Sequence, residues 1–263
     1  MGTKEDVRAI CRADLMKVEL AIVRTYTTLL AGHAPYIAID GGAHAGYHTE
    51  RLGRLRNCGR VIAVEADPWT VVRLRSRVDL FDEALKAKIE VVEAALQEDA
   101  GLRSVTWMSS PSHPGRSGIS SIWQNDHSVQ FREKITVAAT TLDSLSASLS
   151  NRVGVIKLDL EGGDFMAIKG AVETLRRDRP YLVFENSNRA PGIYGFSIGE
   201  FAGLFSSIGY EPLTFFGESA TEGNWFDFWE MWAAPAERAE EARGVLETTV
   251  QELAEGALGL SSM

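Results

Sequence analysis

The sequence predicts an α/β protein built on a parallel β-sheet. Short apolar runs at residues 36–40, 61–65 and 89–95 alternate with helical stretches at 46–55 and 68–80. Strands that alternate with helices of about ten to fifteen residues are typical of βαβ units. The first two runs are apolar throughout, as expected for parallel strands that are covered on both faces. A glycine-rich turn directly follows the first run and marks one end of the sheet.

The α/β pattern is interrupted once and then resumes. Residues 102–137 contain prolines, glycines and many serines, so we predict an insertion there, with short strands at 104–108 and 134–138. Further strands are expected at 153–159 and 180–185, and helices at 167–176 and 196–208. Runs at 210–216 and 226–233 predict an antiparallel pair at a sheet edge, and 236–254 predicts a closing helix.

Two domain segments follow from this pattern. Apolar residues at helical spacing between residues 5 and 31 predict an N-terminal helical extension over 1–34, ahead of a main domain over 35–263. Packing is the default role for the extension. Alternatively, the extension covers the site or forms a contact in a homo-oligomer.

Composition excludes some function classes. The 263 residues carry a net charge of −9, which disfavours nucleic-acid binding. No apolar run reaches the roughly 18 residues of a membrane span, and the charged N-terminus is unlike a signal peptide. We therefore expect a soluble, cytoplasmic protein without a membrane partner, in which Cys11 and Cys58 are free thiols.

The glycine-rich turn points to a nucleoside cofactor. Asp40-Gly41-Gly42-Ala43-His44-Ala45-Gly46 follows the first strand, and Glu65 ends the second. Glycine allows positive φ angles and close approach of a ligand to the backbone. Ligands of open parallel sheets bind at the carboxyl ends of the strands, where an acid such as Glu65 binds ribose hydroxyls.

The spacing within the turn favours S-adenosylmethionine over a dinucleotide. Dinucleotide folds usually read G-x-G-x-x-G, with a helix N-terminus facing a pyrophosphate. Here the spacing is G-G-x-x-x-G, and Asp40 would repel a pyrophosphate but suits the methionine amino group. An NAD-dependent oxidoreductase on a similar fold, and a non-catalytic cofactor-binding module, remain as alternatives.

The chain resembles the FkbM family of S-adenosylmethionine-dependent methyltransferases. The matching segments are residues 39–49, 61–68, 93–96, 140–145, 156–164 and 180–185, and the most specific are Thr141-Leu142-Asp143-Ser144-Leu145 and Lys157-Leu158-Asp159-Leu160-Glu161-Gly162. The resemblance implies a Rossmann-like class I methyltransferase fold, with a seven-stranded sheet of order 3-2-1-4-5-7-6. It also implies O-methylation of a small-molecule hydroxyl, on a sugar or other natural product. The family usually has Asn at the position of His44 and an aromatic residue at that of His48.

The resemblance also implies which residues bind the cofactor. The glycine turn would frame the methionine portion, Glu65 would bind the ribose, and the end of the third strand would border the adenine. The full set is Asp40, Gly41, Gly42, His44, Gly46, Glu65, Ala66, Glu93, Ala94, Ala95 and Asp159.

Candidate catalytic residues follow the fourth strand. Asp159 is expected beside the methyl group, and one of Asp159, Glu161 and His48 would act as the base. Alternatively Asp159, Glu161 and Glu185 would hold a divalent metal that lowers the pKa of the acceptor hydroxyl. Glu161 is otherwise expected to cap the next helix.

Several other residues have structural and functional interpretations side by side. Lys157 is expected to be buried and paired with Asp159 or Glu185. His113 and His127 lie in the insertion and are alternative bases, or simply exposed. The remaining candidates are Trp123 and Trp225, which either form an apolar wall for the acceptor or pack in the core.

Overall fold

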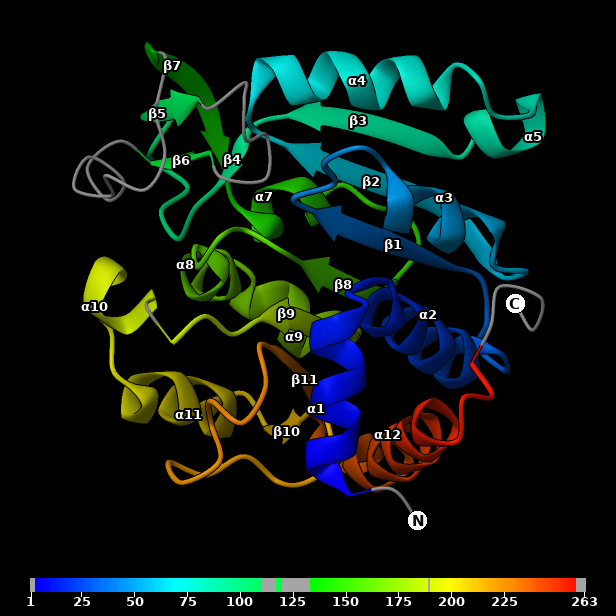
Figure 1. The fold of residues 1–263 in the computed structure, drawn as a ribbon. Helices are drawn as coiled ribbons and strands as arrows, with labels where there is room; N and C mark the ends of the chain where they lie inside the picture. Colours follow the sequence, from blue (N-terminus) through cyan, green and yellow to red (C-terminus); the bar gives the residue numbers. More distant parts are fainter. Residues whose placement is uncertain (1–2, 110–116, 120–132, 189, 259–263) are drawn as a thin grey trace.

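A seven-stranded sheet forms the centre of the molecule in the computed structural model, which describes residues 3–109, 117–119, 133–188 and 190–258 (Figure 1). Its strands lie in the order β3-β2-β1-β8-β9-β11-β10. Numbered along the chain within this sheet alone, that order reads 3-2-1-4-5-7-6. His113, Trp123 and His127 lie outside the described residues.

The first five strands of the sheet run parallel and the last two run antiparallel to their neighbours. Their bounds are β1 (Tyr36–Gly41), β2 (Cys58–Glu65), β3 (Ile89–Glu93), β8 (Val153–Leu158), β9 (Tyr181–Glu185), β10 (Tyr210–Thr214) and β11 (Glu230–Pro235). The expected antiparallel edge pair is therefore present. It begins later than predicted, because residues 226–229 form turns before β11. All five parallel strands end at one edge of the sheet.

Helices cover both faces of the sheet, because successive side chains of a strand point to opposite faces and are apolar on both. Ile37 and Ile39 of β1 join the core on one face, whereas Tyr36 and Ala38 join the core on the other. The first face packs against α7 (Leu142–Ser146), α8 (Asp164–Lys169), α9 (Val172–Asp178) and α11 (Ile198–Ser207). The second packs against α1 (Lys4–Ala13), α2 (Met16–Leu30), α3 (Tyr47–Arg54) and α12 (Ala239–Ala254), which the 3-10 turn η1 (Ala236–Arg238) precedes.

α4 (Pro68–Val78) packs on β2 and β3 at one side of the sheet (Figure 1). The other described helices are α5 (Glu83–Lys86), which contacts α3, and α10 (Ala190–Tyr194). One predicted helix is split in two, because α8 ends at Gly170. A Cβ atom at Gly170 would lie 2.1 Å from the Gln97 carbonyl oxygen. Only glycine therefore allows the end of α8 to pass this close to the backbone at Gln97.

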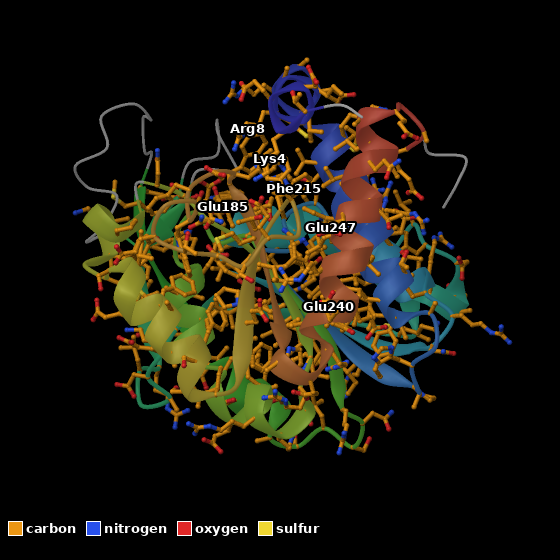
Figure 2. All side chains as sticks on the ribbon, turned by 90° about the horizontal axis from the view of Figure 1, so that it is seen from below. Lys4, Arg8, Glu185, Phe215, Glu240 and Glu247 are labelled. Atoms are coloured by element: carbon orange, nitrogen blue, oxygen red, sulfur yellow. The ribbon has the colours of Figure 1, made fainter. Side chains whose placement is uncertain are left out.

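The N-terminal extension is an integral part of the core. Val7 and Cys11 of α1 and Tyr26 of α2 are at most 1% exposed. Figure 2 shows α12, marked by Glu240 and Glu247, beside these two helices, with Lys4 and Arg8 on α1. Arg24 of α2 forms an ion pair with Glu252 of α12 at 2.8 Å. The extension therefore packs against the main domain, and a further role in covering the site or in a homo-oligomer contact stays a prediction.

The insertion contributes a second, smaller sheet at the ends of β2 and β3 (Figure 1). Its strands, in the order β4-β7-β5-β6, are β4 (Ala95–Leu96), β7 (Glu133–Thr140), β5 (Ser104–Ser109) and β6 (Gly118–Ile119). The two short strands expected in the insertion are present as β5 and β7, which pair antiparallel.

Two smaller expectations can be compared with the structure. Cys11 and Cys58 are both buried free thiols, as predicted. In the part of the chain that the structure describes, no helix has the length and apolar character of a membrane span.

Candidate active site

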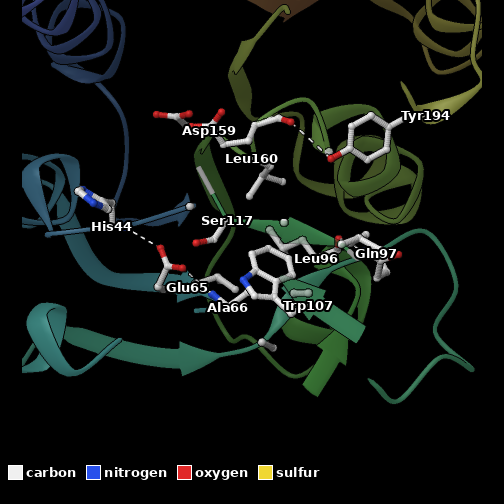
Figure 3. Close-up of a pocket in the computed structure, with 18 residues that line it drawn as sticks. His44, Glu65, Ala66, Leu96, Gln97, Trp107, Ser117, Asp159, Leu160 and Tyr194 are labelled. Carbon is white, nitrogen blue, oxygen red and sulfur yellow. Dashed lines mark hydrogen bonds between the residues drawn. The ribbon is translucent and has the colours of Figure 1, made fainter. Parts of the chain in front are cut away.

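A pocket opens at the carboxyl edge of the parallel strands, between the main sheet and the small sheet (Figure 3). The turn after β1, the ends of β2, β4 and β8, and the strands β5 and β6 all contribute to it. Its lining residues are Gly42, His44, Val64, Glu65, Ala66, Ala94, Ala95, Leu96, Gln97, Trp107, Ser117, Gly118, Ile119, Asp159, Leu160, Glu161, Gly163 and Tyr194. The structure thus brings the glycine turn, Glu65 and Asp159 together around one space.

Gly42 is the tightest point of the turn. Its φ of 73° lies in the left-handed region, and a Cβ atom there would lie 1.9 Å from the Asp159 carbonyl oxygen. The amide groups of Gly42 and Ala43 both donate to the Val64 carbonyl oxygen, at 2.9 and 3.0 Å. Only glycine allows the turn to pass this close to the segment after β8.

Glu65 is buried at the end of β2 and is held by backbone amides. Its Oε2 accepts from the His44 amide, and its Oε1 accepts from the amides of Ala66 and Asp67, each at 2.9 Å. Burial raises the pKa of Glu65 to about 7, although these three hydrogen bonds lower it. A carboxylate has about four acceptor positions. One therefore remains open on Oε2, in a side chain that lines the pocket.

Three members of the predicted cofactor set lie behind the pocket rather than in its lining. The Asp40 carboxylate is 1% exposed and accepts from the Thr49 hydroxyl at 2.5 Å, while its Oδ1 has no partner among the described residues. Gly41 packs against Leu158, and Gly46, at a φ of 80°, begins α3. Asp40 therefore turns toward Thr49 and does not line the pocket, and its predicted effect on the choice of cofactor stays a prediction.

The segment after β3 lines the pocket with its alanines and not with its acid. Ala94 and Ala95 line it, as does Ala66 from the end of β2. Glu93 points elsewhere and forms an ion pair with Arg75 at 3.2 Å, with its side chain 42% exposed.

Asp159 faces the pocket while a buried lysine holds it from the other side. The Lys157 ammonium donates to Asp159 Oδ2 at 3.0 Å, and the lysine side chain is only 4% exposed whereas that of Asp159 is 41% exposed. Burial would raise the pKa of Asp159, but Lys157 outweighs it and keeps the pKa below its ordinary value. The predicted pairing of Lys157 with Asp159 is confirmed.

Glu161 lies in the tight loop after β8 and lines the pocket. Its φ of 52° is left-handed, and its carbonyl oxygen accepts from the Tyr194 hydroxyl at 3.4 Å (Figure 3). Glu161 does not cap the next helix, because α8 begins three residues later with Gly163 at its N-cap and no side-chain cap. Asp164 instead organises this loop by accepting from the amides of Leu160 and Glu185, at 3.3 and 3.2 Å.

The proposed metal ligands do not form a metal site. Within the described ranges, no group of three or more His, Cys, Asp or Glu side chains is arranged to hold a metal ion. Glu185 ends β9 and does not line the pocket, and one oxygen of the Asp159 carboxylate is already bonded to Lys157. Burial and the charge of Asp159 raise the pKa of Glu185 to about 7. Asp159, Glu161 and Glu185 thus do not fit a shared divalent ion, and we derive no step through one.

The two histidines near the turn differ in position. His44 lines the pocket at a φ of 46°, a conformation that explains the family's usual Asn. His48 is 5% exposed and does not line the pocket. Its Nε2 lies 2.6 Å from Glu19 Oε2, and its Nδ1 lies 3.4 Å from the Tyr26 hydroxyl. Both ring nitrogens therefore contact α2, and His48 is not placed to act as a base on an acceptor in this pocket.

Sequence reasoning missed most of the pocket wall that faces the turn. Gln97, Trp107, Ser117, Ile119 and Tyr194 all line it. Gln97 directly follows the segment 93–96 that was expected to border the adenine, so its place in the pocket could have been inferred from the sequence. The strands of the insertion carried no motif that would have indicated a place in the pocket. Trp225 was a candidate for the acceptor wall; it is 1% exposed and packs on Phe201 at a ring-centroid distance of 5.4 Å. Its core interpretation is confirmed.

Comparison with known proteins gives one family match. The model of the methyltransferase FkbM domain matches residues 40–212, which include the turn, Glu65 and Asp159. A search of the curated proteins finds no match.

Solved structures similar to the chain are remote in sequence. A methyltransferase FkbM from Methylobacillus flagellatus is 15% identical, with a TM-score of 0.49, over 76% of this chain but only 43% of that one. The chain therefore spans less than half of that relative. A TehB-like SAM-dependent methyltransferase from Corynebacterium glutamicum is 12% identical, over 81% of this chain and 85% of the other, with a TM-score of 0.39. An O-methyltransferase from Bacillus cereus, in complex with SAH, is 12% identical over 89% and 92%, with a TM-score of 0.43.

Proposed function

Because this chain belongs to the methyltransferase FkbM domain family, we propose that it is an S-adenosylmethionine-dependent methyltransferase that transfers the methyl group to a hydroxyl of a small molecule, such as a sugar or another natural product. The observation that carries the proposal is that Glu65 and Asp159 line the same pocket from different strand ends. One carboxylate suits the ribose of the cofactor, and the other suits the acceptor hydroxyl.

The residues present fit S-adenosylmethionine. The open acceptor position on Glu65 Oε2 suits a ribose hydroxyl, and Ala66, Ala94 and Ala95 leave an apolar space for the adenine. Gly42 lines the pocket with backbone atoms alone, on the side where the methionine portion would approach. Bound there, the cofactor supplies an electrophilic methyl group on a positively charged sulfonium.

Asp159 is the residue that we propose acts on the acceptor. Its carboxylate accepts a hydrogen bond from the acceptor hydroxyl and so aligns the oxygen for in-line attack. As the new C–O bond forms and the C–S bond breaks, the hydroxyl proton becomes strongly acidic and passes to the carboxylate. A group held ionised by Lys157 can therefore serve as base despite its low pKa. Glu161, on the same rim, is the second candidate for this proton.

Calorimetry with S-adenosylhomocysteine and with NAD tests the cofactor. The wild-type chain should bind S-adenosylhomocysteine, and Glu65→Ala should weaken that binding at least tenfold because the ribose loses its acceptor. Binding of NAD alone would refute the proposal and favour an oxidoreductase.

Release of S-adenosylhomocysteine, measured over a panel of hydroxylated acceptors, tests the chemistry. With the acceptor that gives turnover, Asp159→Asn should remove at least 99% of the rate while cofactor affinity stays within a few-fold, because the amide accepts no proton. Glu93→Gln is the matched control, since Glu93 does not line the pocket. Full turnover in Asp159→Asn would eliminate Asp159 as the base, and no turnover with any acceptor in the wild type would favour a binding module.

A further inference from the structure

Trp107 brings the small sheet into the pocket. It lies on β5, opposite Ile119 of β6 and Ile135 of β7, and lines the same space as Glu65. Its ring packs with a small apolar cluster that includes Ala66 and Ala95. This contact fixes the indole beside the end of β2, directly after Glu65 in the chain.

The indole nitrogen of Trp107 is a buried donor without an acceptor. Among the described residues, no group accepts a hydrogen bond from Nε1. A buried Trp N–H usually has a partner, and leaving one unpaired costs about 1–3 kcal/mol. The indole nitrogens of Trp225 and Trp232 are also unpaired, but both side chains are 1% exposed in the core and neither lines this pocket. Of these three unpaired indole donors of the described residues, only that of Trp107 belongs to a side chain that lines the pocket.

Glu65 supplies the complementary group. Figure 3 shows the nitrogen of Trp107 on the side of the indole that faces Glu65. One acceptor position on Glu65 Oε2 is open, as counted above from its three backbone hydrogen bonds. A donor and an acceptor on facing sides of a pocket match a hydroxyl, because its oxygen accepts one hydrogen bond while its proton makes another.

We propose that Trp107 and Glu65 together bind one ribose hydroxyl of the cofactor: the indole N–H donates to the hydroxyl oxygen, and the hydroxyl donates to Glu65. This inference rests on the proposed function, because the ligand is taken to be S-adenosylmethionine. It gives the insertion a role in cofactor binding. It also makes Trp107 a determinant of selectivity for ribose over deoxyribose.

Calorimetry with S-adenosylhomocysteine and with its 2′-deoxy and 3′-deoxy analogues tests the proposal. Trp107→Phe keeps the ring and removes the donor, so it should weaken binding of S-adenosylhomocysteine about tenfold. The same substitution should leave affinity for one of the two analogues unchanged, namely the analogue that lacks the shared hydroxyl. Trp69→Phe is the matched control, because Trp69 is 56% exposed on α4 and does not line the pocket.

The outcomes separate this inference from the proposed function. An unchanged affinity in Trp107→Phe, or an equal loss of affinity for all three ligands, would overturn the proposal that Trp107 and Glu65 bind the same ribose hydroxyl. If Trp107→Phe does not fold, the wild type still decides, because it must bind one deoxy analogue about tenfold more weakly than S-adenosylhomocysteine. Equal affinity of the wild type for all three would refute the inference, whereas no binding of S-adenosylhomocysteine would refute the proposed function itself.

Discussion

Glu65 and Asp159 end two parallel strands and line one pocket, yet their surroundings give them opposite acid–base properties. Glu65 is held by three backbone amides, and burial raises its pKa to about 7. Asp159 is paired with the Lys157 ammonium at 3.0 Å, which keeps its pKa low. A carboxylate at a strand end therefore takes its acid–base properties from the groups around it. Backbone amides orient Glu65, whereas the buried ammonium of Lys157 keeps Asp159 ionised.

The largest expected effect comes from a steric clash between the turn after β1 and the backbone of Asp159 after β8. In Gly42→Ala the new methyl group would meet the Asp159 carbonyl oxygen at 1.9 Å, in a backbone conformation that alanine disfavours. We expect a loss of about 3 kcal/mol of unfolding free energy and a fall in Tm of about 9 °C. Thermal denaturation measures both.

Gly203→Ala is the control for that substitution. Gly203 lies exposed within α11, with nothing within 4 Å of an added Cβ atom. Alanine should therefore raise the unfolding free energy by about 0.5–1 kcal/mol, through helix propensity. An equal Tm for the two variants would contradict the close approach of the turn to β8.

The pH dependence of cofactor affinity sharpens the contrast between the two acids. Glu65 accepts a ribose hydroxyl best when it is ionised, so affinity for S-adenosylhomocysteine should fall as the pH drops through its pKa of about 7. Between pH 8 and pH 6 the Kd should rise about tenfold, because the ionised fraction of a group with a pKa of about 7 falls about tenfold over this range. Asp159 stays ionised throughout this range and adds no slope. Calorimetry on Glu65→Gln should give a flat profile, and a slope as steep as that of the wild type would assign the titration to another group.

The smallest effect is expected at Glu93, the acid that ends the strand next to that of Glu65. Glu93→Gln removes an exposed ion pair with Arg75 at 3.2 Å. Such pairs contribute about 0.2–1 kcal/mol, so stability should change little and the Kd for S-adenosylhomocysteine not at all. A fivefold rise in the Kd would show that Glu93 does contribute to cofactor binding.

The contrast between Glu65 and Glu93 also shows how far sequence reasoning reaches. Both acids end predicted strands, and the glycine-turn motif selected Glu65 because the turn and the second strand are neighbours in the chain and in the sheet. Glu93 was included by position alone, without knowledge of which face of β3 its side chain takes. Asp40 was assigned to the ligand for a similar reason, although its carboxylate turns toward Thr49.

The parallel sheet, the turn at its carboxyl edge, the burial of Lys157 beside an acid and the resemblance to the FkbM family could all be inferred from the sequence. Each of these depends on periodicity or on residues close together in the chain. The sequence left open whether Lys157 pairs with Asp159 or Glu185, and the tertiary packing was needed to show that His48 is held by Glu19 and Tyr26 of α2 and that Trp107 of the insertion faces Glu65. These contacts join segments that no local pattern links, because their geometry is set by how the helices and the small sheet pack on the main sheet.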